Sequence, residues 1–174
     1  MAKAAQNGPG PDASERAKHR VYLAAPLFTL LERRANRSLA RAIQAQWPEV
    51  EIFLPQDLKH GGKFNDPRAF GLIFRKCLAE LQDCQAVLAW LDGADNDSGT
   101  CFEVGYAFAR GIPVVGVRTD FRPNQERGLN IMLSRACAAF VYRPSFDEEV
   151  EGLAADIAKA LRKVLNVRLE DLKA

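Results

Sequence analysis

The chain has 174 residues, a length that suits one domain of ordinary size. Apolar residues make up 48% and charged residues 26%, as in a globular protein, which excludes disordered, fibrous and disulfide-scaffold classes. No apolar run approaches the roughly 18 residues that a membrane span needs, and the N-terminus lacks the apolar core of a signal peptide. We therefore expect a cytoplasmic protein.

The formal charge of +2 comes from the N-terminus. Residues 1–20 carry four cations and two anions, so the remaining residues carry equal numbers of each. A neutral body lacks the cationic surface that binds polyanions. Nucleic acid and anionic membranes are thus not expected as partners, and small neutral ligands are favoured.

The residues that build zinc sites and nucleophilic triads are scarce. The four cysteines show no C-x-x-C spacing, and the two histidines are His19, at the end of the expected leader, and His60, in a polar loop. His60 is interpreted as a loop residue, with a chemical role as the lesser alternative. Neither a zinc site nor a Ser-His-Asp triad is expected.

The first half of the chain alternates strand and helix patterns. Residues 1–19 show no apolar periodicity and are expected to form a disordered leader, followed by one domain over 20–166 and a tail over 167–174. The apolar run 21–25 predicts a buried strand, and 50–54 predicts a second. Two helices are predicted from apolar positions three or four residues apart: Leu31, Ala35, Leu39, Ile43 and Trp47 in the first, and Phe70, Ile73, Phe74, Cys77, Leu78 and Leu81 in the second.

The second half continues the alternation. The run 86–91 is continuously apolar, as expected of a central parallel strand covered on both faces. A helix over 100–110 that ends at Gly111, strands over 113–117 and 138–142, a short apolar segment at 131–133 and a closing helix over 153–165 follow. Such alternation predicts a doubly wound, five-stranded parallel sheet in a single α/β domain, flavodoxin-like or Rossmann-like.

Ligands of such folds bind at the carboxyl ends of the strands, which selects the loops 25–28, 55–57, 92–99 and 118–130. No glycine-rich dinucleotide or nucleoside triphosphate motif is present. The acid-rich stretch 92–106 stands out, because Asp97 can cap a helix that carries Glu103 in its first two turns. Two carboxylates then meet, and the helix N-terminus favours the ionised form that a nucleophile needs. The alternatives are that Asp97 is only a cap, or that the acidic residues hold Mg²⁺.

Three segments in this order resemble the nucleoside 2-deoxyribosyltransferase family. They are Y-L-A-A-P-L-F at 22–28, D-S-G-T-C-F-E-V-G-Y-A at 97–107 and L-N-I-M at 129–132. The second segment is the most specific, and together they span nearly the whole folded chain. The resemblance implies cleavage of the N-glycosidic bond of a 2'-deoxynucleoside and transfer of the sugar to another nucleobase.

The resemblance also implies roles for individual residues. Glu103 matches the family nucleophile that attacks C1', Asp97 an acid that contacts the base, and Tyr22 a residue beside the nucleophile. Asn130 matches a residue that a neighbouring subunit contributes, so a homo-oligomer with shared active sites is expected. No metal and no cofactor are implied. The expected substrate-binding residues are Phe28, Asp92, Gln85, Gly99, Asn130 and Met132.

Two positions depart from the family pattern. Gln85 stands where an Asp is expected at the start of the third strand, unless the register is shifted and Asp83 or Asp92 fills that position. Ala25 replaces a glycine of the first turn.

Two other functions therefore stay open. One is an N-glycosidic hydrolase of deoxynucleosides or their 5'-monophosphates, with Ser98, Arg118 and Arg122 as candidate phosphate donors. The other is a non-catalytic nucleotide-binding module, for which Gln85 is the best argument.

Overall fold

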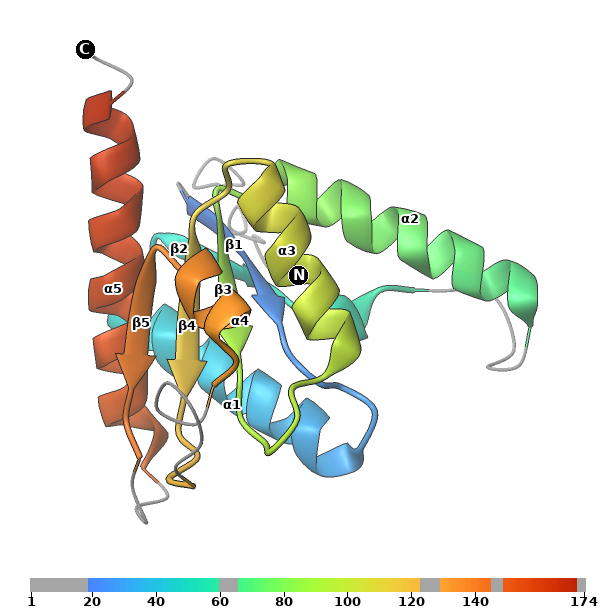
Figure 1. Ribbon diagram of the computed structural model, residues 1–174, viewed down its shortest axis with the longest axis horizontal. Coiled ribbons are helices and arrows are strands. Elements are labelled where there is room, and N and C mark those ends of the chain that lie inside the picture. The colour runs from blue at the N-terminus through green and yellow to red at the C-terminus, as the bar shows by residue number, and fades with distance from the viewer. Residues whose placement is uncertain (1–18, 60–65, 123–128, 145–148, 172–174) are drawn as a thin grey trace, which may run out of the picture.

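A five-stranded parallel sheet forms the centre of the molecule (Figure 1), which confirms the predicted doubly wound α/β fold. The computed structural model describes residues 19–59, 66–122, 129–144 and 149–171. His60 and nearly all of the expected leader lie outside these ranges. No helix in the described part of the chain has the length and apolar character that crossing a membrane requires.

The sheet order is β2-β1-β3-β4-β5, the flavodoxin-like arrangement. The strands are β1 (His19–Ala24), β2 (Val50–Phe53), β3 (Ala86–Trp90), β4 (Val114–Arg118) and β5 (Ala139–Tyr142). β3 lies in the middle, as its continuous apolar run predicted. The strand order reverses between β1 and β3, so the carboxyl ends of these two strands flank the crevice where such folds bind ligands.

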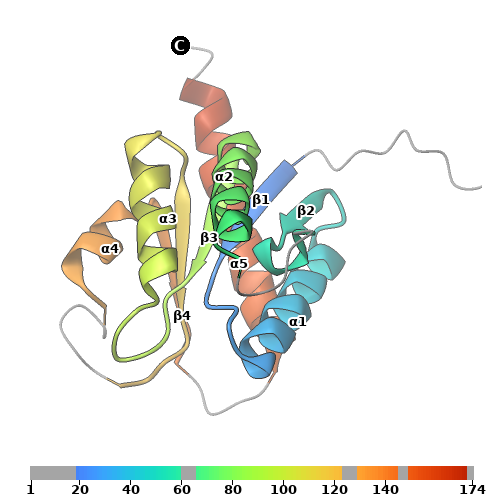
Figure 2. The ribbon, with the colours of Figure 1, turned by 90° about the vertical axis from the view of Figure 1, so that its right-hand side faces the viewer.

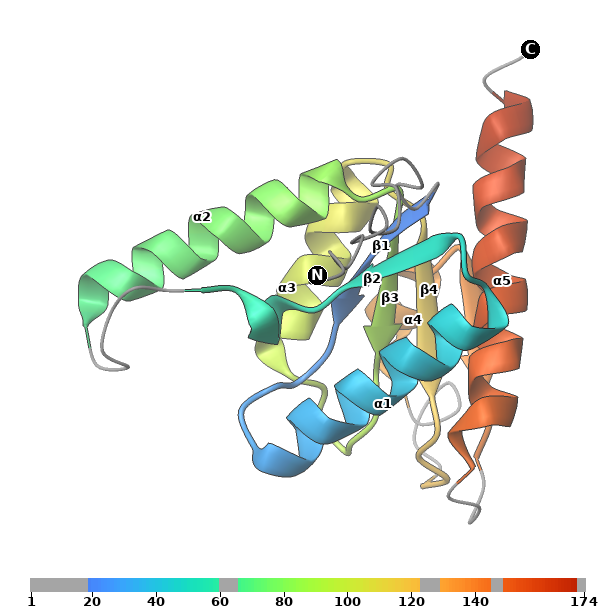
Figure 3. The ribbon, with the colours of Figure 1, turned by 180° about the vertical axis from the view of Figure 1, so that it is seen from behind.

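Helices cover both faces of the sheet (Figure 2). They are α1 (Leu30–Gln46), α2 (Pro67–Asp83), α3 (Ser98–Ala109), α4 (Ile131–Ala136) and α5 (Val150–Asp171), with a 3-10 turn, η1 (Pro55–Asp57), after β2. Seen from behind, α1 and α5 lie side by side on one face (Figure 3), and α2, α3 and α4 lie on the other. Each face has its own hydrophobic core, because strand side chains alternate between the two.

The sequence marks the helix starts clearly. Thr29 and Glu32 form a capping box at α1, with Glu32 N 3.2 Å from Thr29 Oγ1 and Thr29 N 2.7 Å from Glu32 Oε2. Asp66 caps α2 through Arg68 N, and Pro67 occupies the first helical position. α2 therefore begins at Pro67, three residues before Phe70, the first apolar position from which the helix was predicted.

The buried stripe of α1 differs from the one that the spacing predicted. In a helix of 3.6 residues per turn, each step of four residues rotates the side chain by about 40° around the helix axis. A row of apolar side chains at this spacing therefore turns away from the core after about two steps. Leu31 is 76% exposed, while Leu39 and Ile43 are buried and are joined by Asn36. The amide of Asn36 donates to Pro26 O at 2.9 Å and to Gln56 Oε1 at 3.2 Å, which satisfies a polar group in the core.

α2 extends well beyond the sheet (Figure 1). Phe70 and Phe74, which the apolar pattern assigned to the buried side, are 54% and 53% exposed. Phe74 instead contacts Phe102 of α3, with ring centroids 6.0 Å apart. Phe102 is itself 51% exposed, so α2 and α3 together carry three exposed phenylalanine rings: Phe70, Phe74 and Phe102.

Candidate active site

The centre of the candidate site is a hydrogen bond between a strand and a helix. Tyr22 lies on β1 and is fully buried, with its side chain on the face that α2 and α3 cover. Glu103 lies in the second turn of α3, as Asp97 capping predicted. The hydroxyl of Tyr22 is 2.5 Å from Glu103 Oε1. A bond this short is typical of a hydroxyl that donates to a carboxylate.

Burial and this hydrogen bond act in opposite directions on Glu103. Burial raises the pKa of the Glu103 carboxyl to about 7, Asp97 adds to the rise through its charge, and the Tyr22 hydrogen bond opposes it. Burial and the neighbouring Glu103 also raise the pKa of Tyr22, so its hydroxyl keeps its proton. Glu103 therefore changes its protonation state near neutral pH, and burial outweighs the helix N-terminus that was expected to favour its ionised form.

Asp97 is the N-cap of α3. Its Oδ2 accepts hydrogen bonds from Thr100 N at 2.8 Å and from Thr100 Oγ1 at 3.0 Å. A Cβ at Gly99 would lie 3.1 Å from the same oxygen, so the absence of a side chain there gives the capping carboxylate its space. Asp97 therefore caps α3 and also raises the pKa of Glu103 through its charge. Its role as a helix cap does not exclude a second role in the site.

Two further side chains complete the surroundings of the tyrosine. Phe53 of β2 stacks on Tyr22 with ring centroids 5.5 Å apart, and the guanidinium of Arg20 lies 5.2 Å from the Phe53 ring. Cys77 of α2 is half-buried, and burial together with the charge of Glu103 raises the pKa of its thiol. The sequence analysis identified Cys77 only as one of the apolar positions of the second helix. Its thiol was the one feature that set it apart from the other residues of that row.

Asp92 links two loops of the protein. Its Oδ1 accepts from Thr119 N at 2.6 Å and Asp120 N at 2.9 Å. Its Oδ2 accepts from Trp90 Nε1 at 2.8 Å and from the hydroxyl of Thr119. Four protein donors therefore occupy the carboxylate and join the loop after β3 to the end of β4.

Gln85 lies just before β3, toward the amino end of the strand. Its amide oxygen is 3.2 Å from Arg20 N, and Gln85 N donates to Arg20 O at 2.9 Å. The register pairs Tyr22 with Val87, two positions further along. Asp83, the alternative for this family position, forms an ion pair with Arg20 at 2.9 Å.

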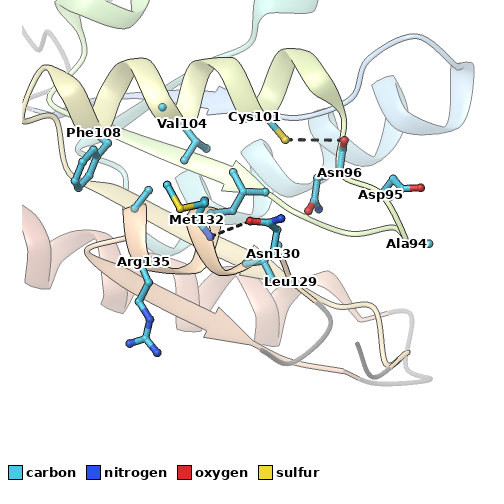
Figure 4. Close-up of a pocket in the computed structure, with 13 residues that line it drawn as sticks. Ala94, Asp95, Asn96, Cys101, Val104, Phe108, Leu129, Asn130, Met132 and Arg135 are labelled. Atoms are coloured by element: carbon cyan, nitrogen blue, oxygen red, sulfur yellow. Dashed lines mark hydrogen bonds between the residues drawn. The ribbon is translucent and has the colours of Figure 1, made fainter. Parts of the chain in front are cut away.

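Asn130 and Met132 face the side of α3 that carries Val104 and Phe108 (Figure 4), and the helix periodicity turns Glu103 away from that side. They line a cavity of about 620 Å³ between α3 and α4, to which α3 contributes Cys101, Val104, Gly105 and Phe108. Asn130 caps α4 by accepting from Met132 N at 2.9 Å, and Met132 is 77% exposed. Within one chain, α3 separates these two residues from the Tyr22–Glu103 pair.

The candidate phosphate donors have different surroundings. Arg118 is 1% exposed and donates to Leu91 O at 2.6 Å and Gly93 O at 3.1 Å. Arg122 forms an ion pair with Asp120. Ser98 is exposed, at the start of α3, and Phe28 is 70% exposed in the loop after β1. Within the described ranges, no three His, Cys, Asp or Glu side chains are grouped to hold a metal ion.

Comparison with known proteins places the chain in a family. The family model for nucleoside 2-deoxyribosyltransferase matches residues 21–132, which include Tyr22, Asp97 and Glu103. The chain belongs to the nucleoside 2-deoxyribosyltransferase family. It is therefore an enzyme of the glycosyl transferase or N-glycosidase type.

Solved structures share the fold. A 2-deoxyribosyltransferase from Bacillus psychrosaccharolyticus is 18% identical with a TM-score of 0.61, over 78% of this chain and 90% of that one. A conserved protein from Enterococcus faecalis V583 is 23% identical with a TM-score of 0.62, over 82% of this chain and 98% of that one. No curated protein sequence matches the chain.

Proposed function

We propose that this protein cleaves the N-glycosidic bond of a 2'-deoxynucleoside and transfers the deoxyribosyl group to another nucleobase, in nucleoside salvage. The observation that carries the proposal is the half-buried Glu103 carboxylate held by the Tyr22 hydroxyl at 2.5 Å. Family membership supports nucleoside and nucleobase substrates. The chemistry requires no cofactor.

The proposed reaction has two displacements at C1' of the sugar. Ionised Glu103 attacks C1' as the bond to the first base breaks, giving a covalent deoxyribosyl-glutamate, and the departing base takes up a proton. The second base then attacks C1' through a ring nitrogen and returns the proton of that nitrogen to the group that protonated the first base, while Glu103 leaves as a carboxylate. Asp97 is the better candidate for the proton donor, because four protein donors already occupy Asp92.

The proposed roles extend to the residues expected around the substrate. Tyr22 orients the nucleophile, and Gly99 leaves space for the Asp97 cap. Phe28, in the exposed loop after β1, is proposed to contact the bound nucleoside. Asp92 and Gln85 support the loop after β3 and the start of that strand, and act on the substrate only through this positioning.

We further propose that two subunits share each site. Asn130 and Met132 are the expected substrate-binding residues that α3 separates from Glu103 of their own chain, so they serve a neighbour. The exposed rings of Phe70, Phe74 and Phe102 provide apolar surface of the kind that subunit contacts cover.

The test of transfer uses products. The protein is incubated with thymidine or deoxyinosine plus free adenine, and the mixture is separated by chromatography. New deoxyadenosine is expected. Free deoxyribose would show a hydrolase instead, and unchanged substrates would show a binding module.

The test of the covalent step uses a slow 2'-fluoro-arabinosyl nucleoside and mass spectrometry. A sugar adduct is expected on Glu103 in the wild type and on no residue in Glu103→Gln. An adduct on a different residue would overturn the assignment of the nucleophile.

The test of shared sites uses mixed subunits. Glu103→Ala and Asn130→Asp are each expected to be inactive alone and to regain activity when mixed and allowed to exchange subunits. Absence of rescue after exchange has been demonstrated would place Asn130 in its own subunit's site or in none.

A further inference from the structure

A second cavity, of about 610 Å³, lies between α1 and the start of α5, the two helices that cover the same face of the sheet (Figure 3). Four arginines of α1 line it: Arg33, Arg34, Arg37 and Arg41. The Tyr22 side chain lies on the other face of the sheet, which α2 and α3 cover. This arginine cavity is therefore separate from the candidate active site.

The stability of α1 does not explain these arginines. All four lie between positions 33 and 41, and the helix has a single acidic residue, Glu32, in its first turn. Arg37 is four residues from both Arg33 and Arg41, a spacing at which like charges destabilise a helix. The last turn, where the helix dipole favours cations, has no basic residue.

Two of the four arginines have partners within the protein. Arg33 donates to Leu27 O at 3.0 Å and to Phe28 O at 2.8 Å, which ties α1 to the loop after β1. Arg37 forms an ion pair with Asp57 of η1 at 2.6 Å. These contacts give both side chains a structural role.

Arg34 and Arg41 have no such role. Both are exposed, and neither guanidinium has a hydrogen-bond or ion-pair partner among the residues that the structure describes. They are seven residues apart, which places them within about 20° of the same helix face and about 10 Å apart along the axis. Ser38 lies between them and lines the same cavity. Two uncommitted guanidiniums and a hydroxyl are thus directed to one concave space.

The rest of the wall sets the character of a ligand. Glu151, in the first turn of α5, also lines the cavity. With Asp57 bound to Arg37, the four arginines face two carboxylates, which leaves a net charge of +2. Leu30 and Val150 add apolar surface. Small-molecule sites commonly combine apolar walls with a few fixed polar groups.

We propose that the arginine cavity binds a small phosphate monoester, with the phosphate between Arg34 and Arg41 and the organic group against Leu30 and Val150. The planar guanidinium matches phosphate oxygens with two parallel hydrogen bonds, and two guanidiniums can hold one phosphate from both sides. A small ligand is favoured over a nucleic acid strand or a membrane, because a polyanion needs many cations along a surface. This inference is independent of the proposed function.

Binding to the full-length protein is measured by isothermal titration calorimetry at low ionic strength, with phenyl phosphate and inorganic phosphate as probes. Phenyl phosphate carries no sugar or nucleobase, so it does not resemble a nucleoside substrate. It is expected to bind at least about five-fold more tightly than inorganic phosphate, because its ring adds apolar contact. Arg34→Gln and Arg41→Gln are each expected to weaken binding about ten-fold, since each removes charge-assisted hydrogen bonds.

Glu151→Gln gives a change of opposite sign. It removes the carboxylate that lines the cavity, so phenyl phosphate is expected to bind about two-fold more tightly. The matched control is Arg75→Gln, which removes an exposed arginine of α2 and should leave the affinity unchanged. Thermal unfolding of each variant shows that it is folded.

Three results would overturn the inference. The first is the absence of phenyl phosphate binding to the wild type, or binding that Arg34→Gln and Arg41→Gln leave intact. The second is an equal loss in Arg75→Gln, which would show a general effect of charge, or equal affinity for the two probes, which would show a site for free phosphate. The third is tighter binding of a single-stranded oligonucleotide or of anionic vesicles, lost in Arg34→Gln, which would assign the surface to a macromolecular partner.

Discussion

Tyr22 and Glu103 are 81 residues apart in sequence and form a 2.5 Å hydrogen bond between β1 and α3. Neither side chain can be understood alone. The buried hydroxyl of Tyr22 needs an acceptor, and a donor to the half-buried carboxylate of Glu103 favours its ionised form. The pair therefore couples the packing of α3 on the sheet to the protonation state of the proposed nucleophile.

Tyr22→Phe is expected to raise the pKa of Glu103 above its value of about 7. The change removes a hydrogen bond to a charged group while keeping the ring in the core, and such bonds correspond to a pKa change of about one pH unit or more. The pH–rate profile should show its acid limb displaced upward, with activity reduced most below pH 7. Tyr106→Phe, which removes a hydroxyl that bonds Gln82 on α2, is the matched control. Equal profiles for wild type and Tyr22→Phe would contradict this prediction.

Glu103→Gln is expected to stabilise the protein at high pH. Because burial raises the folded pKa of Glu103 to about 7, above its ordinary value of 4.5, its favourable contribution is complete below pH 4.5 and is lost as pH rises through 7. Glutamine stays neutral and can still accept the Tyr22 hydrogen bond. Urea unfolding should give a variant more stable than wild type by up to about 3 kcal/mol at pH 8 and similar to it at pH 4.5.

The same measurement on Glu151→Gln, an exposed carboxylate of α5, should show no such dependence on pH. A Glu103→Gln variant that is less stable than wild type at both pH values would show that Glu103 is held as a satisfied structural charge.

Asp97 has two roles that substitution can separate. Asp97→Asn keeps an oxygen for Thr100 N, whereas Asp97→Ala loses the cap and should cost about 1 kcal/mol in the free energy of unfolding. Both should reduce cleavage severely, because neither can deliver a proton. Product assays and urea unfolding on the two variants, with Ser98→Ala as the control, test this. Full activity in Asp97→Asn would reduce Asp97 to a helix cap.

The sequence was sufficient for the features that depend on local pattern. Strand order along the chain, the central position of β3, and the placement of Asp97 before α3 with Glu103 inside it all follow from apolar runs and capping residues. Apolar runs and capping residues are properties of single segments. The features that depend on them can therefore be predicted without knowing how the segments pack.

The features that the sequence did not reveal depend on how segments cross. Tyr22 of β1 meets Glu103 of α3 and Phe53 of β2, and no spacing within any one of these segments encodes the meeting. The role expected of Gln85 came from its place in a family motif. The β1–β3 register pairs Tyr22 with Val87, so Gln85 lies two residues before the position opposite Tyr22. The bonds of Asp92 to Thr119 and Asp120 likewise join loops that are distant in sequence.

Asp92→Asn distinguishes a structural carboxylate from a proton donor. An asparagine oxygen at the Oδ1 position can keep the bonds from Thr119 N and Asp120 N. Its NH₂ group then replaces Oδ2 and faces Trp90 Nε1, so that two donors meet. A buried donor left without an acceptor costs about 1–3 kcal/mol, and urea unfolding should show a loss of this size.

A double-mutant cycle with Trp90→Phe tests the cause of that loss. Because Trp90→Phe removes the opposing N–H, Asp92→Asn should cost less in this background, with a coupling energy of about 1 kcal/mol. Turnover per folded molecule should fall modestly in Asp92→Asn, since the proposed proton donor, Asp97, is intact. If Asp92→Asn abolishes turnover without changing stability, and Trp90→Phe does not alter its effect, Asp92 rather than Asp97 delivers the proton to the leaving base.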